Sequence, residues 1–131
     1  MAVEPTYKRV IDLLKDKLLA EFGSEVHSIV LFGSVARGEA TADSDIDVLI
    51  VTDGVSDTKR RAHEISSEID FDNEVFTQLV SLTIHQLEKE VRMRSWFSSD
   101  VIAQGVILHD DGTYQRIRET HPAFVPGVPG R

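Results

Sequence analysis

The chain has 131 residues, a formal net charge of −8 at pH 7 and no cysteine. Its length fits one domain, and no apolar run reaches the roughly 20 residues that span a bilayer. The missing thiols exclude disulfides and cysteine-based zinc sites. The negative charge disfavours binding to long nucleic acids, which requires a surface of Lys and Arg. Because no secretory signal is recognisable at the start, we expect a cytoplasmic protein.

The hydrophobic pattern alternates between helical and extended segments. At 5–22, apolar side chains recur at helical spacing, and Gly23 follows where a helix commonly ends. The remaining predicted elements are a strand at 26–32, a loop at 33–44, a strand at 46–51, a helix at 58–69, a strand at 74–82, a helix opened by a Thr83–Gln86 capping box and running to about Val91, a short helix capped by 98–100 and ending at Gly105, and a small strand at 106–108.

Strands separated by helices predict a single domain, at 1–120, of the α+β (α/β) class. We expect a mixed sheet of about three to five strands that is flanked by helices mainly on one face. The last segment, 121–131, contains three Pro and two Gly, and it is expected to form a loose tail.

The segment between the first two predicted strands has the features of a phosphate-binding loop. Gly33 follows directly on a strand, where the lack of a Cβ lets the backbone turn and approach a ligand closely. Ser34 offers a hydroxyl and an amide, and successive amides in such a turn form an anion-binding site. Arg37 adds a cation, and Gly38 adds backbone freedom. We therefore interpret Gly33, Ser34 and Arg37 as candidate phosphate-binding residues.

Two acids open the next predicted strand. Asp45 and Asp47 are two residues apart, so both side chains point to one face of an extended strand while Ile46 and Val48 point to the other. Two carboxylates this close repel each other unless a cation lies between them. Mg²⁺ fits, because it takes oxygen ligands and commonly combines one or two carboxylates with substrate phosphates. The pair is the candidate metal site, and we expect Ser44 to shape the turn before it.

Other binding motifs do not fit this segment. An EF-hand loop that opened at Asp43 would need Gly at the position of Val48 and Glu at the position of Gly54. A Walker phosphate loop would need Gly-Lys-Ser/Thr after Gly33. A purely structural interpretation, in which Gly-Ser ends a strand and the acids form a polar edge, explains each feature alone but not their combination.

The residues at 33–38 (GSVARG) and 44–48 (SDIDV) closely resemble the motif of the minimal nucleotidyltransferases in the DNA polymerase β superfamily. The resemblance is specific over 29–51, and it extends in topology through about residue 110. It implies a mixed sheet flanked by helices. It also implies transfer of a nucleoside monophosphate, usually AMP from ATP, to a hydroxyl with release of pyrophosphate.

The resemblance implies roles for individual residues as well. Gly33 and Ser34 would hold the triphosphate. Asp45 and Asp47 would be catalytic and would coordinate one or two Mg²⁺ ions, which stabilise the attacking and leaving oxygens in such reactions.

The family places a third carboxylate on the next strand, and here the chain departs from the pattern. Predicted strand 74–82 has Glu74 as its only acid, on the face shared with Phe76, Gln78 and Val80. Three explanations stay open. Glu74 is the third catalytic carboxylate, or the site works with two acids or with Gln78 as a neutral ligand, or the domain binds nucleotide without turning it over.

Two functions from different classes follow. The leading hypothesis is a Mg²⁺-dependent nucleotidyltransferase that adenylylates a hydroxyl of a protein or small molecule. By resemblance, a helical HEPN-type protein is the expected partner, as in toxin–antitoxin pairs. The alternative is a catalytically weak or inactive, antitoxin-like module that binds a nucleotide or a partner protein and retains the fold.

Other conspicuous side chains are interpreted as structural. Trp96 and Phe97, beside a predicted helix start, favour core packing over base stacking. The basic segments 59–61 and 92–94 favour solvated helix faces over anion sites. The five histidines show no metal-ligand spacing and are expected to be surface or hydrogen-bonded residues: His27, His63, His85, His109 and His121.

Overall fold

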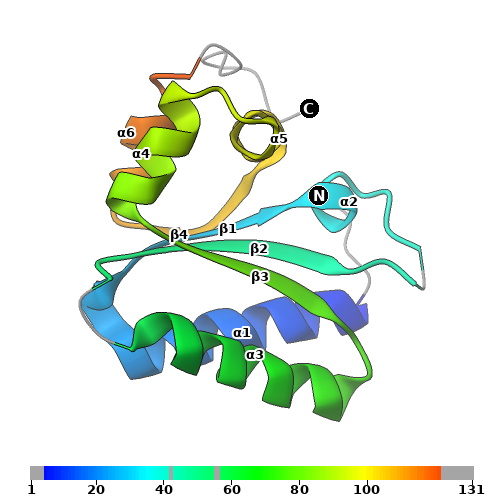
Figure 1. Cartoon of the computed structure of the whole chain (residues 1–131). Coiled ribbons are helices and arrows are strands. Elements are labelled where there is room, and N and C mark those ends of the chain that lie inside the picture. The colour runs from blue at the N-terminus through cyan, green and yellow to red at the C-terminus, as the bar shows by residue number, and fades with distance from the viewer. Residues whose placement is uncertain (1–4, 42, 55–56, 122–131) are drawn as a thin grey trace.

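The computed structural model describes residues 5–41, 43–54 and 57–121, which form one sheet with helices around it (Figure 1). The elements are α1 (Pro5–Phe22), the 3-10 turn η1 (Gly23–Glu25), β1 (Val26–Phe32), α2 (Gly33–Ala36), β2 (Ile46–Thr52), α3 (Thr58–Asn73), β3 (Thr77–Thr83), α4 (Ile84–Arg92), α5 (Trp96–Gln104), β4 (Val106–Asp110) and α6 (Thr113–Arg118).

The four strands form a mixed sheet in the order β3-β2-β1-β4. β1 pairs antiparallel with both β2 and β4, whereas β2 and β3 run parallel. A parallel pair needs a crossover connection, and α3 supplies it (Figure 1). The antiparallel β1–β2 pair brings the end of β1 beside the start of β2, where Phe32 and Asp47 are partners.

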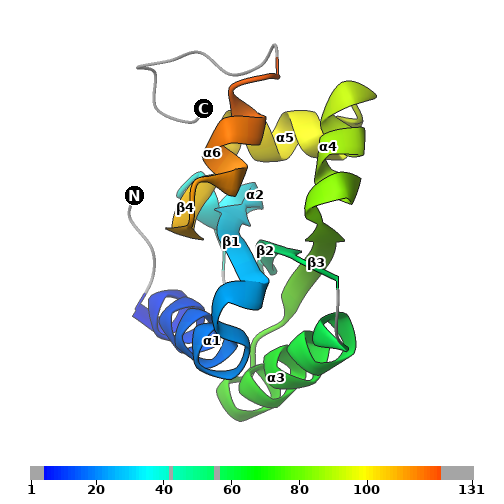
Figure 2. The ribbon, with the colours of Figure 1, turned by 90° about the vertical axis from the view of Figure 1, so that its left-hand side faces the viewer.

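Helices cover both faces of the sheet (Figures 1 and 2). α1 and α3 pack on one face, where Ile29 of β1 and Val48 of β2 are fully buried. α4, α5 and α6 pack on the opposite face, where Val30 and Leu49 are fully buried. Because the central strands are apolar on both sides, each side must be removed from water.

The mixed sheet flanked by helices confirms the predicted fold class, with one correction. Helices were expected mainly on one face, and the long helices α1 and α3 do lie together. The shorter α4, α5 and α6 form a second layer, however, and α6 is not predicted at all from the pattern. The nearly continuous apolar runs of β1 and β2 are the reason for this second layer, since they leave no face for solvent.

Most predicted bounds agree with the structure, and those of three elements differ. α3 continues to Asn73, and Glu74 caps it in the left-handed conformation with φ 54°. β3 therefore begins only at Thr77. α5 is capped by Ser95, whose side chain accepts a hydrogen bond from the Ser98 amide. The segment predicted to cap it lies inside the helix instead.

None of the helices in the described ranges combines the length and apolarity needed to cross a bilayer. The predicted tail lies outside the described residues except for His121, which is buried. The His121 amide donates to the Arg118 carbonyl at 3.1 Å in the turn after α6. The domain boundary at residue 120 stays a prediction.

Candidate functional site

Gly33 joins the end of β1 to a short helix and lies directly against the carboxylate of Asp47. Its φ of +75° is in the left-handed region that side chains rarely adopt. A Cβ added here would lie 2.1 Å from Oδ2 of Asp47 and 3.0 Å from its Cγ. The sequence predicted a close approach of this backbone to a ligand. The structure shows a close approach of this backbone to an acid of the candidate metal pair, and the approach to a ligand stays a prediction.

The loop that begins at Gly33 is anchored at both ends. Val35, in the single turn of α2, is buried, while the neighbouring Ser34 is partly exposed. Near the other end, the Thr41 amide donates to Oγ of Ser44 at 2.8 Å, so Ser44 shapes the turn before the acids as expected. The Tyr7 hydroxyl of α1 donates to the Thr41 carbonyl at 2.7 Å. The loop is thus held in place from the α1 side of the sheet.

The Arg37 side chain links this loop to α5. Its Nε donates to Oε2 of Glu39 at 3.0 Å, and its Nη1 donates to Oε1 of Gln104 at 2.7 Å. The guanidinium also lies close enough to Asp47 to oppose a rise in that group's pKa. Arg37 therefore lies at the site, but two neighbouring side chains already engage it.

Asp45 and Asp47 flank Ile46, which is fully buried on the opposite face of the chain. Across the described ranges, neither carboxylate has a hydrogen-bond or ion-pair partner. Burial, followed by the negative charges of Asp45 and Asp100, raises the pKa of Asp47 above its ordinary value of 3.8. The protein thus concentrates negative charge here without fully neutralising it.

Asp100 is a residue of this site that the sequence pattern assigned to a helix cap. α5 lies over the sheet, above α2 in the view of Figure 2, and its Phe97 meets Phe32 edge-on with ring centroids 5.5 Å apart. Asp100 follows Phe97 by three residues and precedes Gln104 by four, so all three lie on one side of the helix. That side faces the Gly33 loop and Asp47. Helical spacing alone could not reveal this, because it does not say where α5 packs.

The strand beside the acids carries a glutamine, not an acid, at the matching position. In the parallel register of β2 and β3, Asp47 pairs with Gln78. Glu74 is exposed and lies at the end of α3, before β3 begins. The prediction that Glu74 shares a strand face with Gln78 is therefore wrong, because α3 runs four residues beyond its predicted end. The explanation with Glu74 as the third carboxylate assumed that Glu74 lies on the strand beside Asp47, and the structure does not place it there.

The donor set fits a divalent cation that is shared with a ligand. Within the part of the chain that the structure describes, no three His, Cys, Asp or Glu side chains are grouped closely enough to hold a metal ion. Two carboxylates that have no partner among the described residues attract a cation but leave most of its coordination positions open. Mg²⁺ takes such remaining oxygens from water and substrate phosphates. The chemistry of Asp45 and Asp47 therefore fits Mg²⁺ bound together with a triphosphate.

At the other end of β1, a histidine lies between two carboxylates. His27 Nδ1 is 2.5 Å from Oδ2 of Asp111, and its Nε2 contacts Oδ1 of Asp53. The hydrogen bond with Asp53 raises the His27 pKa, burial works against it, and Asp111 adds to the rise. Partial burial favours a higher pKa of Asp111. Hydrogen bonds from Thr113 and His27 outweigh this effect and lower the pKa to about 2. His27 is thus the hydrogen-bonded histidine that was expected.

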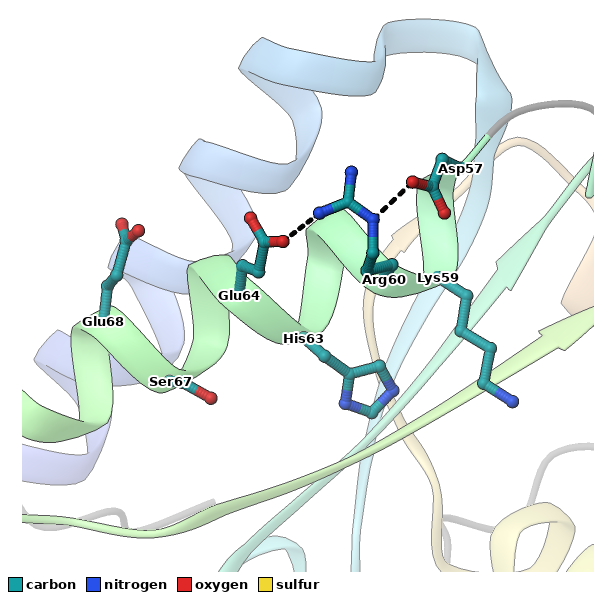
Figure 3. A pocket seen from close by; sticks show the side chains of 7 residues that line it. All are labelled: Asp57, Lys59, Arg60, His63, Glu64, Ser67 and Glu68. Atoms are coloured by element: carbon teal, nitrogen blue, oxygen red, sulfur yellow. Dashed lines mark hydrogen bonds and ion pairs between the residues drawn. The ribbon is translucent and has the colours of Figure 1, made fainter.

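A hollow on the outer face of α3 is separate from this site. Figure 3 shows Arg60 between Asp57 and Glu64, and both carboxylates contact its guanidinium. Lys59 and His63 point away from this group. The helix lies on the sheet face opposite to Asp47, and its mixed, largely paired charges are those of a solvated helix surface, as predicted.

Comparisons with known sequences cover the segment that contains the candidate site. The sequence model of a family described as "Nucleotidyltransferase domain" matches residues 11–109. The matched segment runs from α1 into β4 and includes the Gly33 loop, both acids and α5.

Two proteins of Methanocaldococcus jannaschii resemble parts of the chain. "Putative protein adenylyltransferase MJ1305" is 32% identical over 66 residues, which are 50% of this chain and 45% of that protein. "Putative protein adenylyltransferase MJ0604" is 43% identical over 53 residues, 40% of this chain and 49% of that protein. The aligned part of the chain thus spans less than half the length of either relative.

Solved structures share the fold. A chain of a toxin–antitoxin crystal structure with AMP-PNP superposes with a TM-score of 0.57 at 22% identity, over 82% of this chain and 79% of that one. A chain in the structure of tri-AMPylated Shewanella oneidensis HEPN toxin in complex with MNT antitoxin gives a TM-score of 0.52 at 19% identity, over 86% and 79%. Identities this low establish a common architecture and nothing finer.

Proposed function

This chain belongs to the nucleotidyltransferase domain family, and from that premise we propose that it is a Mg²⁺-dependent nucleotidyltransferase that moves AMP from ATP to a hydroxyl acceptor. The observation that carries the proposal is the contact between Gly33 and Asp47. This contact places the candidate phosphate-binding loop next to the candidate metal-binding pair, Asp45 and Asp47. A triphosphate with its cation needs both within a few ångströms of each other.

In this proposal, Gly33 and Ser34 hold the triphosphate, while Asp45 and Asp47 hold one or two Mg²⁺ ions. Bound Mg²⁺ neutralises phosphate charge and stabilises the charge that develops on the leaving oxygen. The two carboxylates are available for this role, since no partner in the described ranges has to be displaced. Arg37 adds positive charge at the side of the loop that faces α5.

The transfer requires no protein nucleophile. The acceptor oxygen forms a bond to the α-phosphorus of ATP, the bond from that phosphorus to the bridging oxygen breaks, and pyrophosphate leaves. The proton of the hydroxyl passes to a neighbouring carboxylate. Reactions of this kind depend mainly on positioning and charge stabilisation. In this proposal, the Gly33 loop and the pair of Asp45 and Asp47 supply the positioning and the charge stabilisation.

We propose that the acceptor hydroxyl belongs to a partner protein. The relatives are named as protein adenylyltransferases, and one structural neighbour is a complex of an MNT antitoxin with a tri-AMPylated HEPN toxin. The net charge of −8 also favours a protein over a long nucleic acid as the acceptor. A HEPN-type helical protein is therefore the first partner to test.

A second function is favoured by one observation, the glutamine at position 78. Gln78 lies beside Asp47, where the family resemblance leads us to expect an acid. A neutral side chain there weakens attraction for a second cation. The alternative is a module that binds Mg²⁺ and ATP, and a partner protein, with little or no transfer.

Both functions require binding of ATP together with Mg²⁺, and calorimetry of ATP binding with and without Mg²⁺ tests this requirement. We expect binding that requires Mg²⁺ and that is lost in Asp47→Asn. Thermal unfolding gives a cross-check, since ligand at 100 times Kd stabilises a fold by about 2.7 kcal/mol. Failure of ATP and the other nucleoside triphosphates to bind in the presence of Mg²⁺ would contradict both functions.

Transfer itself separates the two functions. The protein is incubated with ATP labelled on the α-phosphate, Mg²⁺ and a HEPN-type partner, and labelled partner and pyrophosphate are measured. Equal amounts of both products support the enzyme. Tight binding of ATP without either product, with partner association intact, supports the binding module.

A further inference from the structure

α5 carries an exposed tryptophan that the proposed chemistry does not use. Trp96 is 84% exposed at the first turn of the helix, although its neighbour Phe97 packs against Phe32. The sequence interpretation of core packing is thus confirmed for Phe97 and wrong for Trp96. Tryptophan combines a broad apolar face with low conformational entropy, and it is therefore common where a protein meets a ligand.

Trp96 shares one side of α5 with Asp100. It precedes Asp100 by four residues, so both lie on the same side of α5, about 6 Å apart along the helix axis. Asp100 acts electrostatically on Asp47. The exposed indole therefore lies about one helical turn from Asp100, the residue of α5 that acts on the candidate metal acids.

A second exposed aromatic ring lies on the sheet side of the same region. The Ile46 amide donates to the Phe76 carbonyl at 3.0 Å, which places Phe76 beside the acid pair. Phe76 is 60% exposed. Side chains alternate along β3, and Leu79 packs toward α1 and α3 whereas Val80 packs toward α4–α6. Gln78 and, two residues before it, Phe76 therefore point to the face that carries α5.

We propose that Trp96 and Phe76 form the nucleobase site for the triphosphate ligand, with the base stacked on Trp96. The inference rests on the proposed function, because it needs the triphosphate held at Gly33, Asp45 and Asp47. A nucleobase suits this surface, since it is uncharged and flat, whereas a second phosphate would be repelled by the acids. Stacking on an aromatic side chain also tolerates different bases.

The protein has a built-in reporter for this contact. Trp96 is the single tryptophan of the chain, so tryptophan fluorescence reports on it alone. With Mg²⁺ present, ATP is expected to quench and shift this emission in a saturable way. Inorganic tripolyphosphate has the phosphates but no base, and it is expected to bind by calorimetry without changing the emission to a comparable extent.

Substitutions test the contact without relying on fluorescence. Trp96→Ala and Phe76→Ala are each expected to weaken ATP binding about tenfold, the loss of one modest stacking contact. Neither should alter tripolyphosphate binding. Trp96→Phe, which keeps a ring, should retain most of the affinity. Phe71→Ala is the matched control, because Phe71 is 86% exposed on α3, on the other face of the sheet.

Three outcomes would overturn the proposal. The first is unchanged ATP affinity in Trp96→Ala while tripolyphosphate still binds, which would reject the base site but leave the proposed function standing. The second is absence of binding of both ATP and tripolyphosphate to the unaltered protein, which would reject both. The third is a Trp96→Ala protein that loses self-association in sedimentation but keeps its ATP affinity, which would make this face a protein interface.

Discussion

The two ends of the central β1–β2 pair carry acids in opposite electrostatic conditions. At the start of β1, His27 lies between Asp53 and Asp111 and gives both carboxylates a hydrogen-bond partner. At the end of β1, Asp45 and Asp47 have no such partner in the described ranges. A third acid, Asp100 on α5, adds to the repulsion that Asp47 experiences. We call these the His27 end and the Gly33 end.

The difference indicates what each end is for. Folded proteins usually pair their partly buried charges, and the His27 end follows this rule. Partnerless acids instead cost stability, and groups perturbed in this way cluster where a ligand supplies the missing charge. Under the proposed function, the His27 end stabilises the sheet, while the Gly33 end receives a cation together with its ligand.

The largest effect is expected from closing the contact at the Gly33 end. Gly33→Ala should lower the free energy of unfolding by about 2–5 kcal/mol, from roughly 1–2 kcal/mol of left-handed strain and 1–3 kcal/mol of overpacking against Asp47. It should also abolish Mg²⁺–ATP binding. Urea unfolding and calorimetry measure the two losses.

Gly23 offers a matched control for that substitution. Its φ is +54°, but an added Cβ would meet nothing within 4 Å. Gly23→Ala should therefore cost only the strain, about 1–2 kcal/mol, and leave ATP binding intact. Equal losses of stability in the two variants would show that the contact with Asp47 is unimportant.

At the His27 end, His27→Ala should affect stability but not ligand binding. The unfolding free energy is expected to fall by about 1–2 kcal/mol at pH 6. Hydrogen bonds to charged groups contribute about 1.5–3 kcal/mol, and partial exposure of both partner carboxylates reduces that contribution. His85→Ala, on the exposed side of α4, is the control and should change stability by less than about 0.5 kcal/mol. Weaker ATP binding in His27→Ala would argue against separate roles for the two ends.

The stabilising effect of His27 should depend on pH in a defined direction. Its folded-state pKa is raised above 6.5, so its contribution is complete below pH 6.5 and is lost as the pH rises through the raised pKa. The Asp111 pKa is lowered to about 2 from 3.8, so that contribution is present above pH 3.8 and is lost as the pH falls toward 2. The stability difference between wild type and His27→Ala should therefore be largest between these limits. A difference that stays constant from about pH 5 to about pH 9 would contradict this assignment.

The smallest effect is expected from adding an acid at the Gly33 end. Gln78→Asp places a third carboxylate on the strand beside Asp47. We expect it to lower the stability of the free protein by about 0.5 kcal/mol, as like charges do on neighbouring strands, and to tighten Mn²⁺ binding severalfold. Ser67→Asp on the exposed face of α3 controls for added charge. If both variants bind Mn²⁺ as the wild type does, position 78 does not contribute to the metal site.

The two ends also differ in how far they could be predicted from the sequence. Gly33, Asp45 and Asp47 depend on local features: a glycine after an apolar strand, and two acids spaced to share a strand face. Asp100 depends on where α5 packs, which no local pattern specifies. The predicted strand position of Glu74 is wrong for a related reason, because α3 continues four residues past its predicted end and Glu74 itself ends the helix in the left-handed conformation. The His27 contacts likewise join residues more than 20 positions apart along the chain.

Thermal unfolding of wild type, Asp47→Asn and His27→Ala, each with and without Mg²⁺–ATP, tests the separation of the two ends most directly. His27→Ala should melt lower than wild type but gain the same increase in Tm from the ligand. Asp47→Asn should melt no lower than wild type, since it removes a repulsive charge, and should gain nothing. An Asp47→Asn protein that gains the wild-type increase would contradict the assignment of the Gly33 end as the nucleotide site.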